Sequence, residues 1–498
     1  MTAVSSGPAS TAPALIGSAP PSPAGPVDES QLAELRSAPE VPLPRIRQVL
    51  AFSTREIEFV FRWRRQLGEV FRFQGIIPGG PTITSHPDHV RSLFTANPAL
   101  VPSLTAESPL LPIVGPSSVL TANGPRHLRQ RKLLLPPFHG EAIERYVAAI
   151  RDIADREIDG WPLDTPVPLA PLMQAIMLDV IASGILGIDG QPRPGTPEHG
   201  LVQTIKRVTA LSTTPIAKLT EFRNLGHKEP VGLLRRVLAV LDRHTYGLIS
   251  ERRRDPGLAK RDDILSLIMR AQTEDGEALS DQEVRDELLT LILAGFETTA
   301  NSLAWSWERL VRNPGAYDAL REGVRSGQDA EGHVERVILE TMRNRPVIPV
   351  VGRRVQVPWR LGDFGVPAGA PISVSVLLVH HREDVYPDPF AYRPDRWLER
   401  GGGTKASAGE SGGGSGRDEG GRRTVLKPGT YEWIPFGGGT RRCLGAALAM
   451  AEQRVVLSAM ARRLHLQAVD PEPERAQHRN VTMIPSGGAR VIIRSRRP

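Results

Sequence analysis

The segment from Ser280 to about Arg312 constrains the fold of this 498-residue chain more than any other. Ser280 and Glu283 form a capping-box pattern, which marks a helix start. Apolar residues then recur at helical spacing until Asn313-Pro314 ends the pattern. Some 30 residues at about 1.5 Å each make a rod of about 45 Å, long enough to cross a whole domain. Because the helix is apolar nearly all round at its centre, we expect it to run through the core.

Most of the remaining chain also reads as helices, with β structure in a minor role. Short alternating runs at 82–84 and 371–376 predict small sheets at the edges of the molecule. Residues 1–40 are rich in Pro, Ala and Ser and poor in large apolar side chains, so we expect a disordered tail. A Gly-rich stretch at about 401–423 predicts a flexible surface insertion. The expected fold class is mainly α with small β-sheets, in one domain over 41–498.

Charge and cysteine content exclude several classes of protein. Lys and Arg number 62 against 55 Asp and Glu, a modest net charge of +7 that is scattered along the chain. Nucleic-acid binders concentrate such charge, so we expect no nucleic-acid partner. A single cysteine excludes an intrachain disulfide and a protein-ligated iron–sulfur cluster, and it fits a reducing cytoplasm.

No apolar run is expected to span a membrane. The longest candidate, Leu288 to Phe296, is stopped by Glu297 and is shorter than the roughly 18 to 20 residues that a span requires. The N-terminus also lacks the pattern of a signal peptide. We therefore expect a cytoplasmic protein, and a monomer.

The lone cysteine lies in the stretch Phe436-Gly437-Gly438-Gly439-Thr440-Arg441-Arg442-Cys443-Leu444-Gly445. A thiolate ligand must be deprotonated, although a free cysteine has a pKa of about 8.5. A tight loop of small residues lets backbone N–H groups reach the sulfur, Arg441 adds positive charge, and Phe436 can cover the loop. Apolar residues at helical spacing follow, which places Cys443 at a helix N-terminus, where negative charge is stabilised. Each feature favours the thiolate.

A second unusual stretch, Ala294-Gly295-Phe296-Glu297-Thr298-Thr299, falls in the middle of the long helix. Glycine costs about 1 kcal/mol against alanine in a helix interior. The hydroxyl of Thr298 can bond to a carbonyl of the preceding turn and loosen the helix. These unfavourable choices indicate a function, namely a groove that admits a small molecule and a polar path for protons.

Both stretches resemble signatures of the cytochrome P-450 family. The cysteine stretch matches Phe-x-x-Gly-x-Arg-x-Cys-x-Gly at every fixed position, and 294–299 matches the acid–alcohol motif. The resemblance covers roughly 41–498 apart from the Gly-rich insertion. It implies the cytochrome P-450 fold, with the long central helix over haem b and Cys443 as the ligand to iron. It also implies that Glu297 and Thr298 deliver protons for oxygen activation.

Two later stretches extend the resemblance. Glu340-Thr341-Met342-Arg343 is similar to the family's Glu-x-x-Arg motif, and Arg393-Pro394-Asp395-Arg396-Trp397 to its Pro-x-Arg-aromatic motif. The family pattern implies a buried ionic triad behind the cysteine loop, formed by Glu340, Arg343 and Arg396. The gap from Arg396 to Cys443 is longer than is usual in the family, and the Gly-rich insertion accounts for the excess.

The resemblance also implies which residues meet the two haem propionates. His127 and Arg131 lie four apart in a helix-like stretch, and Arg353 is the expected third partner, with Arg354 left open as the alternative. Arginine suits such places because guanidinium pairs with carboxylate in a bidentate manner. We treat the neighbouring pair His380-His381 as structural. The residues expected to contact the cofactor are Cys443, His127, Arg131, Arg353, Arg441, Phe436, Gly437, Ala294 and Gly445.

The function that the resemblance implies is insertion of one oxygen atom from dioxygen into an apolar small molecule, by hydroxylation or epoxidation. Electrons would come from a ferredoxin or flavodoxin with its NAD(P)H-dependent reductase, because the chain leaves no room for a flavin domain. Arg129, Lys132 and Arg442 are candidates for docking that donor. The substrate would touch largely aliphatic stretches, which lie at 103–120, 293–296, 347–351 and 483–486.

Other functions remain as alternatives at this stage. A haem-thiolate protein that senses a ligand without turnover has no need of the acid–alcohol pair, and a peroxide-driven relative would be expected to lack it. The stretch Gly409-Glu410-Ser411-Gly412-Gly413 fits the Gly-x-Ser-x-Gly pattern of serine hydrolases. That pattern needs a strand before it and a helix after it, so within a Gly-rich linker we interpret it as chance.

Overall fold

We describe the fold from a computed structural model of the chain. It describes residues 20–497 apart from 75–78, 108–109, 139, 189–191, 212–219, 221–222, 225–226, 228, 274–275, 328, 330–331, 399–424, 427 and 480. The first 19 residues and the expected Gly-rich insertion, with its Ser411, lie outside the described residues.

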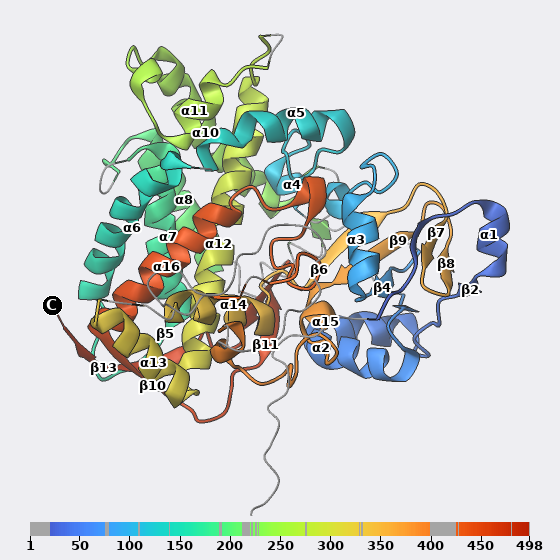
Figure 1. Cartoon of the computed structure of the whole chain (residues 1–498). Coiled ribbons are helices and arrows are strands. Elements are labelled where there is room, and N and C mark those ends of the chain that lie inside the picture. The colour runs from blue at the N-terminus through green and yellow to red at the C-terminus, as the bar shows by residue number, and fades with distance from the viewer. Residues whose placement is uncertain are drawn as a thin grey trace, which may run out of the picture.

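Helices form the larger part of the molecule (Figure 1). The α-helices are α1 (Glu29–Glu34), α2 (Arg45–Leu67), α3 (Pro87–Thr95), α4 (Leu111–Val114), α5 (Gly124–Leu134), α6 (Glu141–Asp159), α7 (Leu169–Leu186), α8 (Pro197–Leu211), α10 (Leu233–Arg254), α11 (Ile264–Arg270), α12 (Asp281–Leu310), α13 (Pro314–Arg325), α14 (His333–Asn344), α15 (Val376–His380) and α16 (Ala446–Arg463). Short 3-10 helices are η1 (Leu104–Glu107), η2 (Pro136–Phe138), η3 (Leu258–Lys260), η4 (Pro394–Trp397) and η5 (Gly439–Arg441).

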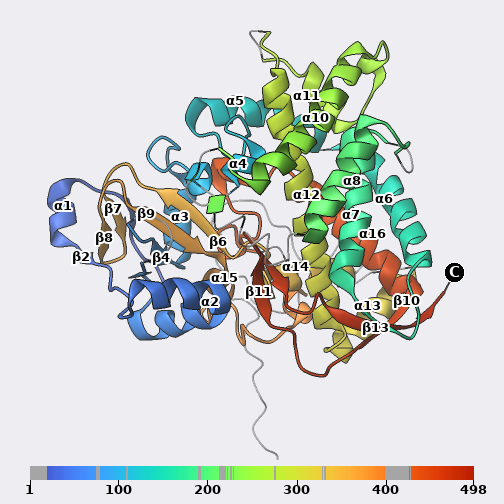
Figure 2. The same ribbon diagram turned by 180° about the vertical axis from the view of Figure 1, so that it is seen from behind.

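Small sheets occupy the edges, as the sequence predicts. One sheet has the order β3 (Phe71–Arg72), β4 (Thr82–Thr84), β9 (Pro371–Ser375), β6 (Val350–Arg354), and another has β1 (Ala24–Pro26), β7 (Trp359–Leu361), β8 (Phe364–Val366), β2 (Arg36–Ser37). The others are β10 (Leu464–Ala468), β13 (Arg490–Arg496), β5 (Pro166–Pro168) and the hairpin of β11 (Ala476–Arg479) with β12 (Thr482–Pro485). In both views the first two sheets lie together with α1, α2 and α3 on one side of the molecule, and α6, α7, α8 and α16 lie on the other side (Figure 2).

The long central helix is confirmed as α12. Its N-cap is Ser280, and the capping box with Glu283 is formed in both directions. Nearly every residue from Val284 to Leu310 is buried, apart from a short stretch around Ala294. Helices α7, α10, α14 and α16 pack against α12 and share its apolar core, and α6 covers α7 and α16. The helix therefore forms the centre of the core, and its acid–alcohol stretch lies inside the protein.

The expected disordered tail is wrong for residues 20–40. Residues Ala24–Pro26 pair antiparallel with Trp359–Leu361, and Arg36–Ser37 pairs in parallel with Phe364–Gly365. Between them α1 begins with a capping box at Asp28. Backbone pairing with strands more than 300 positions away stabilises this segment, although its own composition offers little apolar surface to bury.

Helix α7 corrects the expectation that no segment is long and apolar enough to cross a membrane. Its 18 residues meet that criterion by length and composition, but 61% of them are buried inside the protein. A soluble core helix passes the same test, and α7 packs along α12 throughout its length. We therefore interpret α7 as a core helix.

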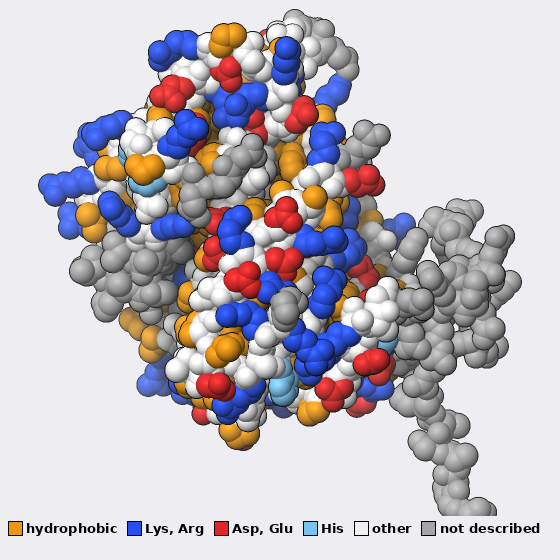
Figure 3. Space-filling view, turned by 90° about the vertical axis from the view of Figure 1, so that its left-hand side faces the viewer, with side chains coloured by type: hydrophobic (Ala, Val, Ile, Leu, Met, Phe, Trp, Pro, Cys, Tyr) orange, Lys and Arg blue, Asp and Glu red, His pale blue; other side chains and the backbone are white. Residues whose placement is uncertain are grey.

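The surface charge follows the scattered pattern of the sequence. On the face that presents α6 and α13, basic and acidic side chains lie interspersed and do not form a stripe (Figure 3). A stripe of one sign is the usual footprint of a nucleic-acid interface, so this face shows none.

Candidate active site

The loop before Cys443 is closed by backbone hydrogen bonds. The N–H of Cys443 donates to the carbonyl of Phe436 at 2.9 Å, and the N–H of Arg442 donates to that of Gly439 at 3.1 Å. Gly437 and Gly439 have φ angles of +65° and +63°, in the left-handed region that favours glycine. The loop therefore turns back on itself and presents Cys443 just before α16.

Close packing on α3 also requires the glycines of this loop. A Cβ atom on Gly438 would overlap the ring of Phe94, and one on Gly439 would overlap the backbone oxygen of Phe94. At Gly445, the N-cap of α16, a Cβ would meet nothing within 4 Å. The loop is thus pressed against α3 on one side, while Phe436 packs edge-on against Trp433 with ring centroids 6.1 Å apart.

The thiol of Cys443 does not have the lowered pKa that its sequence context predicts. Burial raises the pKa above its usual value of 9.0, against the effects of the Gly445 backbone N–H and of Arg131 and Arg442, which lower it. The side chain of Cys443 is nevertheless exposed to solvent. Protein therefore surrounds the sulfur without covering it. A metal ion would take the place of the proton, because a bound thiol is deprotonated outright.

Four basic side chains from three elements meet near this loop. His127 and Arg131 come from α5, Arg353 from β6 and Arg441 from η5. Burial, followed by the charges of Arg441, Arg131 and Arg353, lowers the pKa of His127 to about 4. Burial and then Arg353 and Arg131 lower the pKa of Arg441 to about 10. The four groups therefore lie close enough to repel one another.

Two members of this basic cluster have polar atoms that lack partners. The Nδ1 atom of His127 is buried and makes no hydrogen bond within the described part of the chain. The guanidinium of Arg353 is buried over the ring of Phe94, 5.4 Å from its centroid, and it donates only to the carbonyl of Gly352, at 3.0 Å. Burial lowers the pKa of Arg353 to about 10. Among the described residues, the Nδ1 atom of His127 therefore has no partner, and Arg353 has only this backbone carbonyl.

The other two members are bound to backbone oxygens. Arg131 donates to the carbonyl of Arg442 at 2.7 Å, and Arg441 donates to carbonyls of the segment 119–122 and to the side chain of Asn123. Among the described residues, no carboxylate pairs with any of the four. Buried cations are tolerated when they are paired, so the cluster fits a ligand with two carboxylate groups, as haem b has.

The structure separates Arg353 from its neighbour, the alternative that the sequence leaves open. Arg354 forms two hydrogen bonds with Glu107, at 2.9 and 2.6 Å. Successive side chains of a strand point to opposite faces, so Arg354 on β6 points away from the basic cluster. Arg353 is the member of that cluster.

The acid–alcohol stretch keeps its two functional groups in separate contacts. The hydroxyl of Thr298 donates to the carbonyl of Ala294 at 2.7 Å, as the sequence predicts. Glu297 accepts from Arg479 at 2.9 Å and from Thr482 at 3.1 Å, both on the β11–β12 hairpin. Ala294 is exposed although it lies in the middle of the buried α12. The sequence did not predict the pairing of Glu297 with Arg479.

The glycine in this stretch serves close helix packing. A Cβ on Gly295 would lie 2.5 Å from the Cδ1 atom of Ile181 on α7. The groove expected from this glycine is therefore, at least on that side, filled by an isoleucine side chain.

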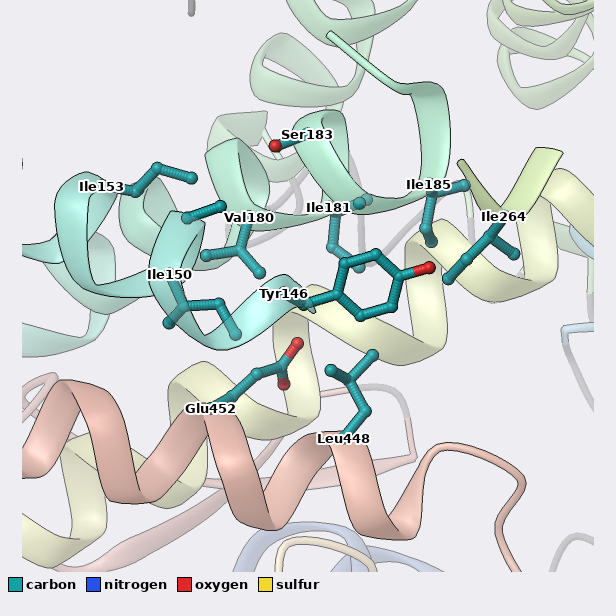
Figure 4. A pocket seen from close by; sticks show the side chains of 12 residues that line it. Tyr146, Ile150, Ile153, Val180, Ile181, Ser183, Ile185, Ile264, Leu448 and Glu452 are labelled. Atoms are coloured by element: carbon teal, nitrogen blue, oxygen red, sulfur yellow. The ribbon is translucent and has the colours of Figure 1, made fainter. Parts of the chain in front are cut away.

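A small cavity of about 20 Å³ lies between α6, α7, α11 and α16, beside this stretch (Figure 4). Its walls are mostly aliphatic, and Glu452 of α16 points into it together with the ring of Tyr146. The carboxyl of Glu452 is buried and accepts a hydrogen bond from Thr299 at 3.0 Å. Burial raises the pKa of Glu452 to about 8, so at neutral pH the group is mostly protonated. Glu452 is not among the site residues that the sequence predicts.

The pKa of Glu452 predicts a pH-dependent stability. A carboxyl group whose pKa is higher in the folded state stabilises the fold at low pH, and this contribution is lost as the pH rises from about 4.5 to about 8. Between pH 5 and pH 8 the natural protein should lose about 3 kcal/mol more unfolding free energy than Glu452→Gln, in which this group does not titrate. Urea unfolding at the two pH values measures this difference, and parallel losses in the two proteins would contradict it.

The expected buried triad is present. Glu340 and Arg343 pair through two hydrogen bonds of 2.8 and 2.9 Å, and the Nε atom of Arg396 reaches the same carboxylate at 3.1 Å. Glu340 also accepts from the Nε1 atom of Trp397 at 3.0 Å. All three charged side chains are buried, and Arg343 and Arg396 donate their remaining N–H groups to backbone carbonyls. The carboxylate is thus fully satisfied.

His380 connects this triad to the cysteine loop. Arg343 donates to the carbonyl of His380 at 2.8 Å, and the Nε2 atom of His380 accepts from the N–H of Ile434 at 2.8 Å. Burial lowers the pKa of His380 to about 3, which keeps the ring neutral and able to accept. The structural interpretation of His380, the last residue of helix α15, therefore agrees with its contacts.

Two of the candidate docking residues lie on α5, and the third directly precedes Cys443. Arg129 forms ion pairs with Glu277 at 3.4 Å and with Glu283 at 3.2 Å. Lys132 lies in the last turn of α5, and Arg442 is exposed directly before Cys443. Arg442 is therefore the candidate nearest to the sulfur.

Comparison with known proteins agrees with this geometry. The family model described as cytochrome P-450 matches residues 38–492. A Mycobacterium tuberculosis protein named as cytochrome P-450 137 is 35% identical over 442 residues, which covers 88% of this chain and 86% of that protein. A Mycobacterium bovis protein named as cytochrome P-450 138 is 34% identical over 465 residues, covering 93% and 97%. The cyanobacterial CYP120A1 with bound retinoic acid shares the fold, with a TM-score of 0.71 at 20% identity, over 93% of this chain and 100% of that one.

A cysteine loop before a helix, a long core helix with an acid–alcohol stretch, and a basic cluster that no carboxylate of the described chain pairs with are together typical of a haem-thiolate protein. This chain belongs to the cytochrome P-450 family. Members of this family bind haem b through a cysteine thiolate and act as oxidoreductases of the monooxygenase class.

Proposed function

We propose that this protein inserts one oxygen atom from dioxygen into an apolar small molecule, with electrons from a separate redox partner. The basic cluster beside Cys443 carries this proposal, because its four side chains lack carboxylate partners in the described chain and suit the two propionates of haem b. When bound, the haem supplies the iron that activates dioxygen, and the thiolate of Cys443 donates electron density that favours O–O cleavage.

The chain's own residues would bind and orient the cofactor. Cys443 would hold the iron, and His127, Arg131, Arg353 and Arg441 would hold the propionates. The remaining proposed contacts come from the loop and the central helix: Phe436, Gly437, Gly445 and Ala294. The accessible Ala294 supports this assignment, since it leaves one part of α12 uncovered by protein.

Proton delivery is the proposed role of Glu297 and Thr298. The Thr298 hydroxyl donates its proton to the Ala294 carbonyl, so the lone pairs of its oxygen can accept a hydrogen bond from a water molecule or another donor. Glu297 is half-buried and paired with Arg479. To carry a proton it must release Arg479, which requires its side chain to turn away from the β11–β12 hairpin.

Thr298→Ala tests this role. We expect the variant to fold and to bind haem, because it loses only a hydroxyl bonded within its own helix. Product per electron pair consumed should fall by about a hundredfold, the lower end of an acid–base contribution, with hydrogen peroxide appearing in its place. Ser306→Ala, eight positions later on α12, is the matched control, because the hydroxyl of Ser306 also donates within the helix, to the carbonyl of Ser302 at 3.1 Å, and it should keep full coupling. Unchanged coupling in Thr298→Ala would exclude the role.

The proposed redox partner is inferred from exposed charge beside Cys443, and the proposed substrate class from aliphatic side chains on α12 and β6. An acidic ferredoxin or flavodoxin, reduced by an NAD(P)H-dependent reductase, would dock near Arg442, whose exposed charge lies beside the cysteine loop. Half-buried aliphatic side chains at Leu293, Val350 and Val351 suit an apolar substrate. We propose a cytoplasmic, monomeric enzyme. Turnover with dioxygen and such a donor, compared with turnover on peroxide alone, separates this function from a peroxygenase or a sensor.

A further inference from the structure

Two buried carboxyl groups on the first half of α12 bind the backbone of the segment 115–123. Asp286 accepts from the N–H of Ser117 at 2.9 Å, and Glu287 accepts from the N–H of Val119 at 2.7 Å. Neither acid belongs to a motif that the proposed mechanism uses. They attach a segment without regular structure to the central helix of the core.

The segment fits closely on α12 around these contacts. The hydroxyls of Ser118 and Thr290 lie 2.6 Å apart. Gly115 has φ +84°, and a Cβ there would overlap the carboxylate of Asp286. The backbone of 115–123 is therefore held at a fixed distance from the helix.

Arg441 holds the same segment from its other side. Its guanidinium donates to the carbonyls of Val119 at 3.2 Å and Leu120 at 3.4 Å, and also to the Ala122 carbonyl and the Asn123 side chain. Both backbone groups of Val119 are therefore bound: its N–H donates to Glu287, and its carbonyl accepts from Arg441. Its backbone links α12 to the basic cluster.

Unlike Asp286, Glu287 forms no ion pair with any residue that the structure describes. Arg285 pairs with Asp286 at 2.8 Å. Glu287 is fully buried, and its Oε2 atom makes no hydrogen bond to any described residue. Burial raises the pKa of Glu287 to about 8, helped by the charges of Asp286 and Glu283. A neutral acid at this place contributes mainly the oxygen that accepts from Val119.

We propose that Glu287 is a positioning residue for the cofactor's carboxylates, because it fixes Val119 and thereby the guanidinium of Arg441. This inference rests on the proposed haem site and adds to it a residue that does not touch the cofactor. What matters under this proposal is the reach of the side chain and its acceptor oxygen. Its charge should not matter.

Three substitutions separate reach from charge. Glu287→Gln keeps the length and the acceptor oxygen, Glu287→Asp keeps the acid but withdraws it by one methylene, and Glu287→Leu removes the acceptor. Glu308→Leu is the control, since Glu308 is an equally buried acid at the far end of the same helix, bound to Arg312 and to the N–H of Glu474.

The readout is the rate at which each haem-loaded protein loses haem to an excess of a haem-accepting apoprotein. We expect about a tenfold faster loss for Glu287→Leu and a several-fold faster loss for Glu287→Asp, as for one lost hydrogen bond. Glu287→Gln should stay within about twofold of the natural protein. Glu308→Leu should unfold at a lower temperature without faster haem loss at temperatures where it is folded.

Two results would overturn the inference. One is haem loss from Glu287→Leu no faster than from Glu308→Leu; if the leucine variant does not fold, Glu287→Asp takes its place in this comparison. The other is rapid loss from Glu287→Gln with normal retention by Glu287→Asp, which would assign the role to charge. The carbon monoxide spectrum of the natural protein is recorded first. A spectrum without thiolate ligation would refute the proposed function and this inference with it, whereas a thiolate spectrum with either result above would refute the inference alone.

Discussion

Replacing Glu340 with alanine is expected to lower the unfolding free energy by about 3 to 5 kcal/mol, the usual cost of removing one partner from a buried charge pair. The change leaves Arg343 and Arg396 buried without their carboxylate. It also removes the acceptor of the Trp397 indole N–H. Urea unfolding of the purified protein measures the loss.

The cysteine loop should respond to this substitution as well. Arg343 anchors His380, and His380 accepts from the backbone of the loop at Ile434. We therefore expect haem content to fall together with stability. Glu335→Ala is the matched control on the same helix, because Glu335 pairs with Arg454 at the partly exposed surface, at 2.5 Å. Such a pair contributes about 1 kcal/mol or less. Equal losses for Glu340→Ala and Glu335→Ala would contradict the structural role of the triad.

A methyl group at position 439 is expected to have an effect of similar size. Gly439 combines a φ of +63° with a Cβ position that overlaps the backbone oxygen of Phe94. The conformational strain and the overpacking together cost roughly 3 to 5 kcal/mol. Because the obstacle is the backbone of α3, it cannot move aside as a side chain would. We expect Gly439→Ala to yield protein without bound haem.

Substitutions at two neighbouring glycines separate the cost of the positive φ angle from the cost of the steric overlap. Gly437 has a φ of +65° but open space around its Cβ position, and Gly445 has open space and no positive φ. Gly437→Ala should therefore cost about 1 to 3 kcal/mol, and Gly445→Ala should be close to neutral. Haem content per protein and urea unfolding of the three variants measure the order. Normal haem content in Gly439→Ala would refute the packing argument.

Local patterns predicted the elements whose partners lie nearby in the sequence. The cap at Ser280 and the apolar run of α12 depend on neighbours within a few turns, so the helix and its capping box could be predicted. The triad could be predicted because a family motif specified its members, including the distant Arg396. The choice between Arg353 and Arg354 could not be made, because the partner strand decides which face of β6 is buried.

Long-range contacts decided what the sequence could not predict. Residues 24–37 have a composition typical of a tail, but they pair with strands more than 300 positions away. Acids at positions 287 and 452 resemble ordinary interruptions of apolar helices until the structure shows their partners, Val119 and Thr299. Glu287 follows Arg285 and Asp286, and Glu452 precedes Gln453 and Arg454, so the sequence carried no signal that marks either acid as buried.

The central claim is that the sulfur of Cys443 binds the iron of haem b. The most direct test is the carbon monoxide difference spectrum of the reduced, haem-loaded protein, recorded for the natural chain and for Cys443→Ala. We expect a thiolate-type Soret band in the natural chain and its complete loss in the variant, even where the basic cluster still retains some haem. An identical Soret band in both proteins would contradict the assignment of Cys443 as the ligand.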